Sequence, residues 1–140
     1  MSKAAELAAL IGSQSAQSHR NMVINGAMNV AQRSTSTASV TSSGYHACDR
    51  WNLFGTSFGT YTVSQSSTSP DGFANSLKLD CTTADASPAA GDHFGIHIKF
   101  EGQDLQQLQK GTSSAKSVVV SFFVRSNKTG TYTLELDDRD

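Results

Sequence analysis

Short segments in which apolar and polar side chains alternate recur along most of this 140-residue chain, and they constrain its fold more than any other feature. Residues 93–100 show the pattern best, with Phe94, Ile96 and Ile98 on one face and two histidines on the other. A period of two residues is that of a β-strand with one buried face. Because Gly-, Ser- and Asn-rich turns separate such segments, the sequence predicts an all-β sandwich.

The predicted strands share this alternation or a strongly apolar composition; they lie at residues 22–30, 49–54, 60–65, 76–81, 93–100, 116–125 and 131–136. Residues 34–43 are almost wholly Ser, Thr and Ala, which is typical of a surface loop or an edge strand. Residues 102–110 predict a short helical turn closed by Gly111. The inward positions of the strands define a predicted core: Val23, Trp51, Leu53, Val63, Leu77, Leu79, Phe94, Ile96, Ile98, Val118, Val120, Phe122, Tyr132 and Leu134.

Residues 1–12 give the only strong helix signal, with Ser2 as a candidate cap and Gly12 at the expected end. One apolar stripe runs along this helix and Leu10 flanks it; the stripe consists of Ala4, Leu7, Ala8 and Ile11. A helix of ~10 residues is marginal alone in water, so it must pack on its own domain, on a partner, or on copies of itself. A polar Ser/Gln linker follows, which predicts a helix-and-linker segment at 1–20 and a β domain at 21–140.

Charged residues make up only 16% of the chain, and the formal net charge is -1, so nucleic acid is not an expected partner. The apolar runs are far shorter than the ~20 residues of a bilayer span, and residues 1–20 lack a signal-peptide core. The chain therefore reads as made in the cytosol, without membrane insertion. Cys48 and Cys81 both lie in strand-like runs, which favours buried free thiols over a disulfide.

No pattern of catalytic or metal-ligating residues stands out. His93 and His97 lie four apart on a strand, ~13 Å at ~3.3 Å per residue, which is too far for one ion. No Gly-x-Ser-x-Gly elbow occurs, and the acidic residues near position 140 read as a solvated stretch rather than a glycosidase pair. We therefore predict no enzyme activity, no metal and no cofactor.

The chain opens its β domain with Asn25-Gly26 and Gln32-Arg33, and continues with Tyr45 and Asp49-Arg50-Trp51. In this order, over about residues 21–137, the chain resembles jelly-roll domains of bacteriophage tail fibres and other virion appendages, especially of marine phages. The run at 121–126, with the following Gly-Thr-Tyr, is also similar to the late strands of galactose-binding-like carbohydrate modules. Ala27 stands where the family often has a larger or charged residue.

The resemblance implies a jelly-roll-like β-sandwich preceded by a short helix and linker. It implies a structural protein of the virion, the N-terminal attachment part of a tail fibre that forms a homotrimer and docks on a tail adaptor or portal-proximal ring. The helix resembles the anchoring segment of such fibres, so Ala4, Leu7, Ala8, Leu10 and Ile11 are the expected docking residues. We also expect the chain to be the front part of a longer polypeptide; the alternative is a compact sandwich with fewer strands.

Two further functions stay open. A carbohydrate-binding module would contact host glycan directly, and Tyr45, Phe54 and Phe58 are the candidate contacts because they flank turns. Trp51 could also stack on sugar, but its alternation with Leu53 favours a core position. An accessory domain of a secreted enzyme is the third reading, against which the missing signal peptide weighs.

Overall fold

The structure is a computed structural model that describes residues 2–12 and 21–138, with only the backbone described for residues 8–12. The chain divides into two compact units between Glu101 and Gly102, and each is described by itself. The predicted linker at 13–20 lies outside the described residues.

The N-terminal helix forms as the sequence predicts. Helix α1 spans Lys3–Gly12. Ser2 caps it, because the backbone N–H of Ala5 donates to Ser2 Oγ at 3.3 Å and the N–H of Glu6 donates to the Ser2 carbonyl at 3.1 Å. The first of these bonds satisfies a donor that a helix leaves unpaired in its first turn, and the second is the first i→i−4 backbone bond of the helix.

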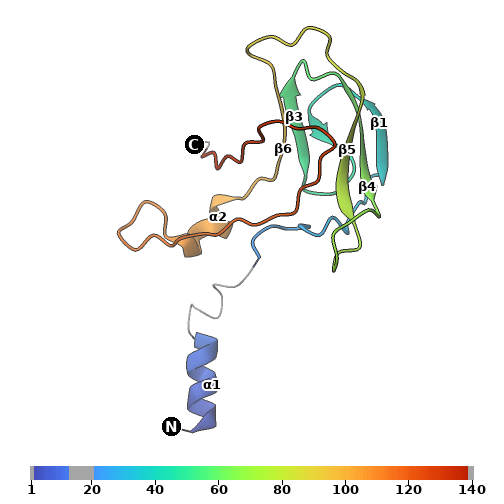
Figure 1. The fold of residues 1–140 in the computed structure, drawn as a ribbon. Coiled ribbons are helices and arrows are strands. Elements are labelled where there is room, and N and C mark those ends of the chain that lie inside the picture. The colour runs from blue at the N-terminus through green and yellow to red at the C-terminus, as the bar shows by residue number, and fades with distance from the viewer. Residues whose placement is uncertain (1, 13–20, 139–140) are drawn as a thin grey trace. The chain divides into compact units, whose positions relative to one another are not determined.

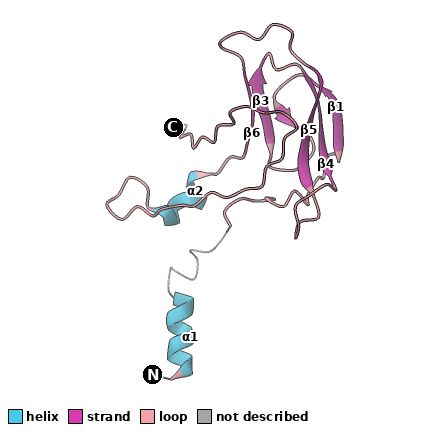
Figure 2. Cartoon of the chain, viewed as in Figure 1, coloured by secondary structure: helices cyan, strands magenta, loops and turns pink. Residues whose placement is uncertain are grey.

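Two antiparallel three-stranded sheets follow, and they confirm an all-β domain (Figures 1 and 2). The first sheet has the order β1-β4-β5 and the second the order β2-β3-β6. Their bounds are β1 Ser36–Val40, β2 Gly44–Tyr45, β3 Asn52–Thr56, β4 Thr60–Ser66, β5 Ser76–Thr83 and β6 His93–His97. Strand β1 lies at an edge, as its Ser- and Thr-rich sequence predicts.

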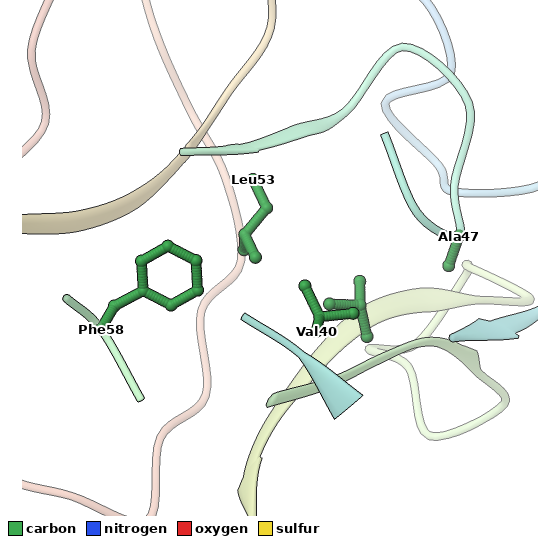
Figure 3. Packing of buried hydrophobic residues seen from close by; sticks show 5 residues of the cluster. Val40, Ala47, Leu53 and Phe58 are labelled. Carbon is green, nitrogen blue, oxygen red and sulfur yellow. The ribbon is translucent and has the colours of Figure 1, made fainter. Parts of the chain in front are cut away.

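One apolar core lies between these sheets and draws on both. Figure 3 shows the side chains of Val40, Leu53 and Phe58 converging from three segments. Ala47 and Val63 complete the buried cluster, and Tyr61, Leu77 and Leu79 pack against it partly buried. The core prediction is confirmed for Leu53 and Val63. Four further predicted core residues, Leu77, Leu79, Trp51 and Val23, are half-buried.

The apolar side chains of strand β6 lie on the predicted face of the sheet, but they are less buried than predicted. Ile96 pairs with Leu53 of β3, while Phe94 stacks on Tyr61 with ring centroids 4.3 Å apart. Phe94 is nevertheless 36% exposed and Ile96 41% exposed, and Ile98 is half-buried. The reason is that β6 is an edge strand, so β3 covers it from one side only.

The predicted first strand at residues 22–30 is wrong, because this segment turns at residues 24–27 and is irregular on either side. Asn25 and Met28 adopt left-handed backbone conformations, with φ of 57° and 56°. Asn tolerates this region and its side chain can replace sheet hydrogen bonds with local ones. The apolar run therefore wraps the end of the domain instead of joining a sheet.

The second unit begins with the predicted helical turn. Helix α2 spans Gly102–Leu105 and the 3₁₀-helix η2 spans Gln106–Leu108; the turn ends at Gln109, where φ is 50°. The chain also bends at residues 127, 128 and 130, and a hydrogen bond of 2.7 Å joins the hydroxyls of Ser126 and Tyr132 across the bend.

The predicted strands at 116–125 and 131–136 are wrong, since neither segment pairs in a sheet within the described part of the chain. Val118 is half-buried, and four other predicted core residues of this unit are exposed: Val120, Phe122, Tyr132 and Leu134. Alternation and β-propensity express only fitness for a sheet, whereas a strand exists where a neighbour takes up its backbone N–H and C=O groups.

Candidate functional site

The side chain of Asn25 forms hydrogen bonds within its own turn and to a second segment, at Asp49. Its Nδ2 donates to the carbonyl of Val30 and to that of Asp49, both at 2.9 Å, and its Oδ1 accepts the Val30 N–H at 2.9 Å. The Asp49 N–H in turn donates to the Val30 carbonyl at 2.9 Å. The Asn25 amide therefore fixes the turn at 25–30 against the segment that leads into β3.

Other residues of the opening motif form hydrogen bonds to Asn25 and Asp49. The indole N–H of Trp51 donates to the Asn25 carbonyl at 3.1 Å, which is the partner that a half-buried Trp needs. The Gln32 N–H donates to the Asp49 carboxylate at 3.3 Å. The polar residues of the motif therefore hold neighbouring segments in place. We call the Asn25 side chain, with its bonds to Val30 and Asp49, the Asn25 clasp.

A polar hollow of about 230 Å³ lies beyond the end of the β2-β3-β6 sheet. Tyr45 pairs with Asn52 at the start of β3, and Asn52 pairs with His97 at the end of β6. The hollow is lined by residues at or just past these strand ends: Tyr45, Arg50, Lys99 and Glu101. Sheet topology thus gathers residues that are far apart in the sequence.

Two arginines are held beside this hollow. The Arg33 guanidinium lies 5.5 Å from the centroid of the Tyr45 ring, and its Nη1 donates to the Tyr45 carbonyl at 3.4 Å. Arg50 donates from Nη2 to the Lys99 carbonyl at 3.3 Å. Each guanidinium carries five N–H groups, so these single bonds orient the group and leave others for a ligand. The lining of the hollow thus has two cationic groups, Arg50 and Lys99, and one carboxylate, Glu101, while Arg33 lies over the Tyr45 ring.

The three candidate glycan contacts lie in different places. Tyr45 is 42% exposed, as predicted for a residue beside a turn. Phe54 is half-buried, with its ring 4.8 Å from that of His97 and 5.8 Å from that of His93. Phe58 is a buried core residue, so its predicted exposure is wrong. The loop between β3 and β4 carries the chain from one sheet to the other, and Phe58 plugs the space between them.

Arg33, Arg50, Lys99 and Glu101 were not among the predicted site residues. The sequence carries Arg33 and Arg50 in its recognisable motif, but Lys99 lies 49 positions beyond Arg50. No local pattern joins them.

Of the expected docking residues, Ala4 and Leu7 are exposed on α1, and Leu7 is 57% exposed. The side chains of Ala8, Leu10 and Ile11 lie outside the described residues. The structure thus leaves part of the stripe open to a partner without showing one.

The two cysteines are both free, and they differ in burial. Cys48 is buried as predicted, whereas Cys81 is exposed, which corrects the prediction for that residue. Cys81 is on β5, an edge strand whose outer positions lack cover. Burial, and secondly the charge of Asp49, raise the pKa of the Cys48 thiol.

We expect iodoacetamide at about pH 8 to alkylate Cys81 of the native chain at least ten times faster than Cys48. The thiolate is the nucleophile, and a raised pKa keeps the Cys48 thiol protonated in this range. Mass spectrometry of the modified peptides gives both rates. In a C81S variant, the remaining thiol should react only after urea is added; rapid alkylation without urea would contradict the burial of Cys48.

Neither a metal site nor a membrane span is found in the described ranges 2–12 and 21–138. No three His, Cys, Asp or Glu side chains there are arranged to hold an ion, and none of the helices is long and apolar enough to cross a bilayer. The Phe54 ring contacts both His93 and His97 on one face of the sheet.

Comparison with known proteins gives no assignment: no protein-family model, no curated protein and no solved structure matches this chain. Any function must therefore be argued from the residues themselves.

Proposed function

We propose that this chain is a structural protein of a phage virion, the N-terminal attachment part of a tail fibre that docks through α1. The observation that carries the proposal is the capped ten-residue helix that exposes Leu7. A helix of this length gains most of its stability from packing its apolar stripe. Docking on a ring of other virion proteins, as part of a homotrimer, would supply that packing.

The finer fold in this proposal is a jelly roll, which has eight strands in two sheets. The described residues form six strands in two antiparallel sheets around a shared core. The segments 116–125 and 131–136 form no strand within the described residues, but they expose large apolar side chains, including Val119, Phe123 and Leu136, and burial against another surface would remove these from water.

The docking stripe gives the experiment for the attachment proposal. Replacing both Leu7 and Ile11 with Asp in the parent phage should yield folded protein but particles without fibres. Full burial of a Leu or Ile side chain contributes roughly 1.5–3 kcal/mol, and several copies would lose this together. Electron microscopy and mass spectrometry of purified particles measure fibre occupancy.

The matched control places the same two charges on the other side of the helix, as Ala5→Asp with Ala9→Asp. On a period of 3.6 residues these positions lie opposite the stripe. Control particles should keep their fibres. Fibres retained by the Leu7 and Ile11 variant, or absent from both variants alike, would show that this stripe is not the anchor.

A second function, a carbohydrate-binding module, is favoured by a separate observation. Tyr45 presents a partly exposed ring beside a polar hollow, with Arg33 held over that ring. An aromatic face beside polar groups suits a sugar, which has an apolar C–H face and hydroxyls around its edge. The two functions are compatible, since α1 and the hollow involve different residues.

A further inference from the structure

We propose that the hollow lined by Tyr45, Arg50, Lys99 and Glu101, with Arg33 over Tyr45, binds one acidic sugar residue, whose carboxylate or sulfate the arginines recognise. The inference rests on the second proposed function, glycan contact, and names the class of glycan. It does not depend on docking through α1.

The first observation in support is the charge of the residues at the hollow. The chain is poor in charged residues and has a net charge of -1, yet two of its eleven Lys and Arg residues, Arg50 and Lys99, line this one hollow, and a third, Arg33, lies over the ring of Tyr45. The lining contains one carboxylate, that of Glu101. The local balance is therefore cationic on a protein that is otherwise close to neutral, and it would attract an anion within a Debye length of ~8–10 Å.

The second observation is the way in which the two guanidinium groups are held. A guanidinium matches a carboxylate or sulfate with two parallel N–H groups, which a Lys ammonium does not. Arg50 is fixed by its bond to the Lys99 carbonyl, and Arg33 by its bond to the Tyr45 carbonyl and by the ring below it. Ordering these long side chains before binding lowers the entropic cost of holding a ligand.

The backbone around the hollow supports a functional role. Arg50 has a φ of 73°, a left-handed conformation that is uncommon for Arg. Such conformations are strained and cluster at functional sites. The Asn25 clasp holds this conformation from the neighbouring residue, because Asn25 Nδ2 bonds to the Asp49 carbonyl.

Size and shape select a sugar over other anions. The hollow, at about 230 Å³, is smaller than the ~300–1,000 Å³ of pockets that take drug-sized ligands, so it suits one ring of a longer saccharide. Tyr45 offers an aromatic face for the apolar side of that ring. A nucleic acid would call for a basic stripe along several phosphates, and the chain's charge does not provide one.

The test measures binding of the full 140-residue chain to three labelled oligosaccharides by fluorescence polarisation. The probes are trigalacturonic acid for a carboxylate, a carrageenan tetrasaccharide for a sulfate, and cellotetraose as the neutral counterpart. We expect at least one acidic probe to bind ten times more tightly than cellotetraose. Which acidic probe binds identifies the recognised group, and its affinity should fall as salt is raised.

Variants connect the binding to the hollow. Arg50→Gln and Tyr45→Ala should each weaken the acidic probe at least tenfold, while Arg50→Lys, which keeps the charge, should weaken it less than Arg50→Gln. Glu101→Gln should strengthen the acidic probe about two- to fivefold by removing a repulsive charge, and leave cellotetraose unchanged. Lys78→Gln is the matched control; Lys78 forms an exposed ion pair with Asp80 on β5 and should not matter.

The outcomes separate this inference from the function on which it rests. Equal binding of acidic and neutral probes, unaffected by Arg50→Gln, would overturn the acidic-sugar site while leaving a glycan-binding module. Failure of all three probes to bind would overturn the acidic-sugar site, and a broader glycan array would then decide whether any module function remains. A single-stranded DNA decamer that binds more tightly than the sugars and loses its binding in Arg50→Gln would overturn the assignment in favour of phosphate.

Discussion

Replacing Gly59 with Ala is expected to destabilise the β domain by about 3–5 kcal/mol, through a left-handed backbone and a backbone clash together. Gly59 has a φ of 78° and immediately precedes β4. A Cβ at this position would run into the backbone carbonyl oxygen of Thr83 and lie 3.0 Å from the backbone nitrogen of Asp85. Backbone atoms cannot swing aside as a flexible side chain can, so β4 and β5 would have to separate where they pair.

Urea unfolding followed by circular dichroism measures this loss as a lower midpoint at an unchanged slope. Gly72→Ala is the matched control, because Gly72 has a φ of 87° but nothing lies within 4 Å of a Cβ there. It isolates the cost of the left-handed backbone, about 1–2 kcal/mol. Equal losses in the two variants would mean that the close approach of Gly59 to β5 is absent from the folded protein.

Within residues 36–97, local patterns in the sequence predicted strands that overlap β3, β4, β5 and β6; they left β1 open between a surface loop and an edge strand, and they did not predict β2. The alternation at 76–81 and 93–100 gave β5 and β6 with the right faces, since Leu77 and Leu79 turn to the core and Phe94 stacks on Tyr61. The near-continuous apolar run at 116–125 and the alternation at 131–136 also predicted strands, and neither strand forms within the described part of the chain. Alternation reports that a segment suits a sheet, but pairing depends on a second segment that the local sequence does not contain.

The candidate site depended on longer-range contacts. Trp51 and Asn25 are 26 positions apart, and Arg50 and Lys99 are 49 apart. The opening motif of the sequence contains Asn25, but no local pattern indicates that its side chain bonds to Val30 and Asp49. The position of Phe58 beside a turn predicts an exposed ring. The chain crosses between the sheets there, and this brings Phe58 into the core.

Replacing Asn25 with Ala is expected to lower the free energy of unfolding by about 3 kcal/mol. Three side-chain hydrogen bonds are lost, each contributing roughly 0.5–1.5 kcal/mol, and Ala is less suited than Asn to the left-handed backbone at this position. Urea unfolding gives the loss. Because the clasp positions Asp49 next to Arg50, the variant should also weaken an acidic sugar at the hollow, even in conditions where it stays folded.

Three companion variants divide this effect into its causes. Asn25→Gly relieves the backbone cost and keeps the loss of the side chain, so it should be less destabilising than Asn25→Ala by about 1 kcal/mol. Asn25→Asp keeps the acceptor for the Val30 N–H but turns a second oxygen toward two carbonyls, so it should be at least as harmful as Asn25→Gly. Asn75→Ala loses one exposed bond, to Asn29, and should cost under about 1 kcal/mol. If Asn25→Ala lowered the free energy of unfolding no more than Asn75→Ala, the Asn25 clasp would be no more than an ordinary surface turn. The positioning of Arg50 would then need another cause.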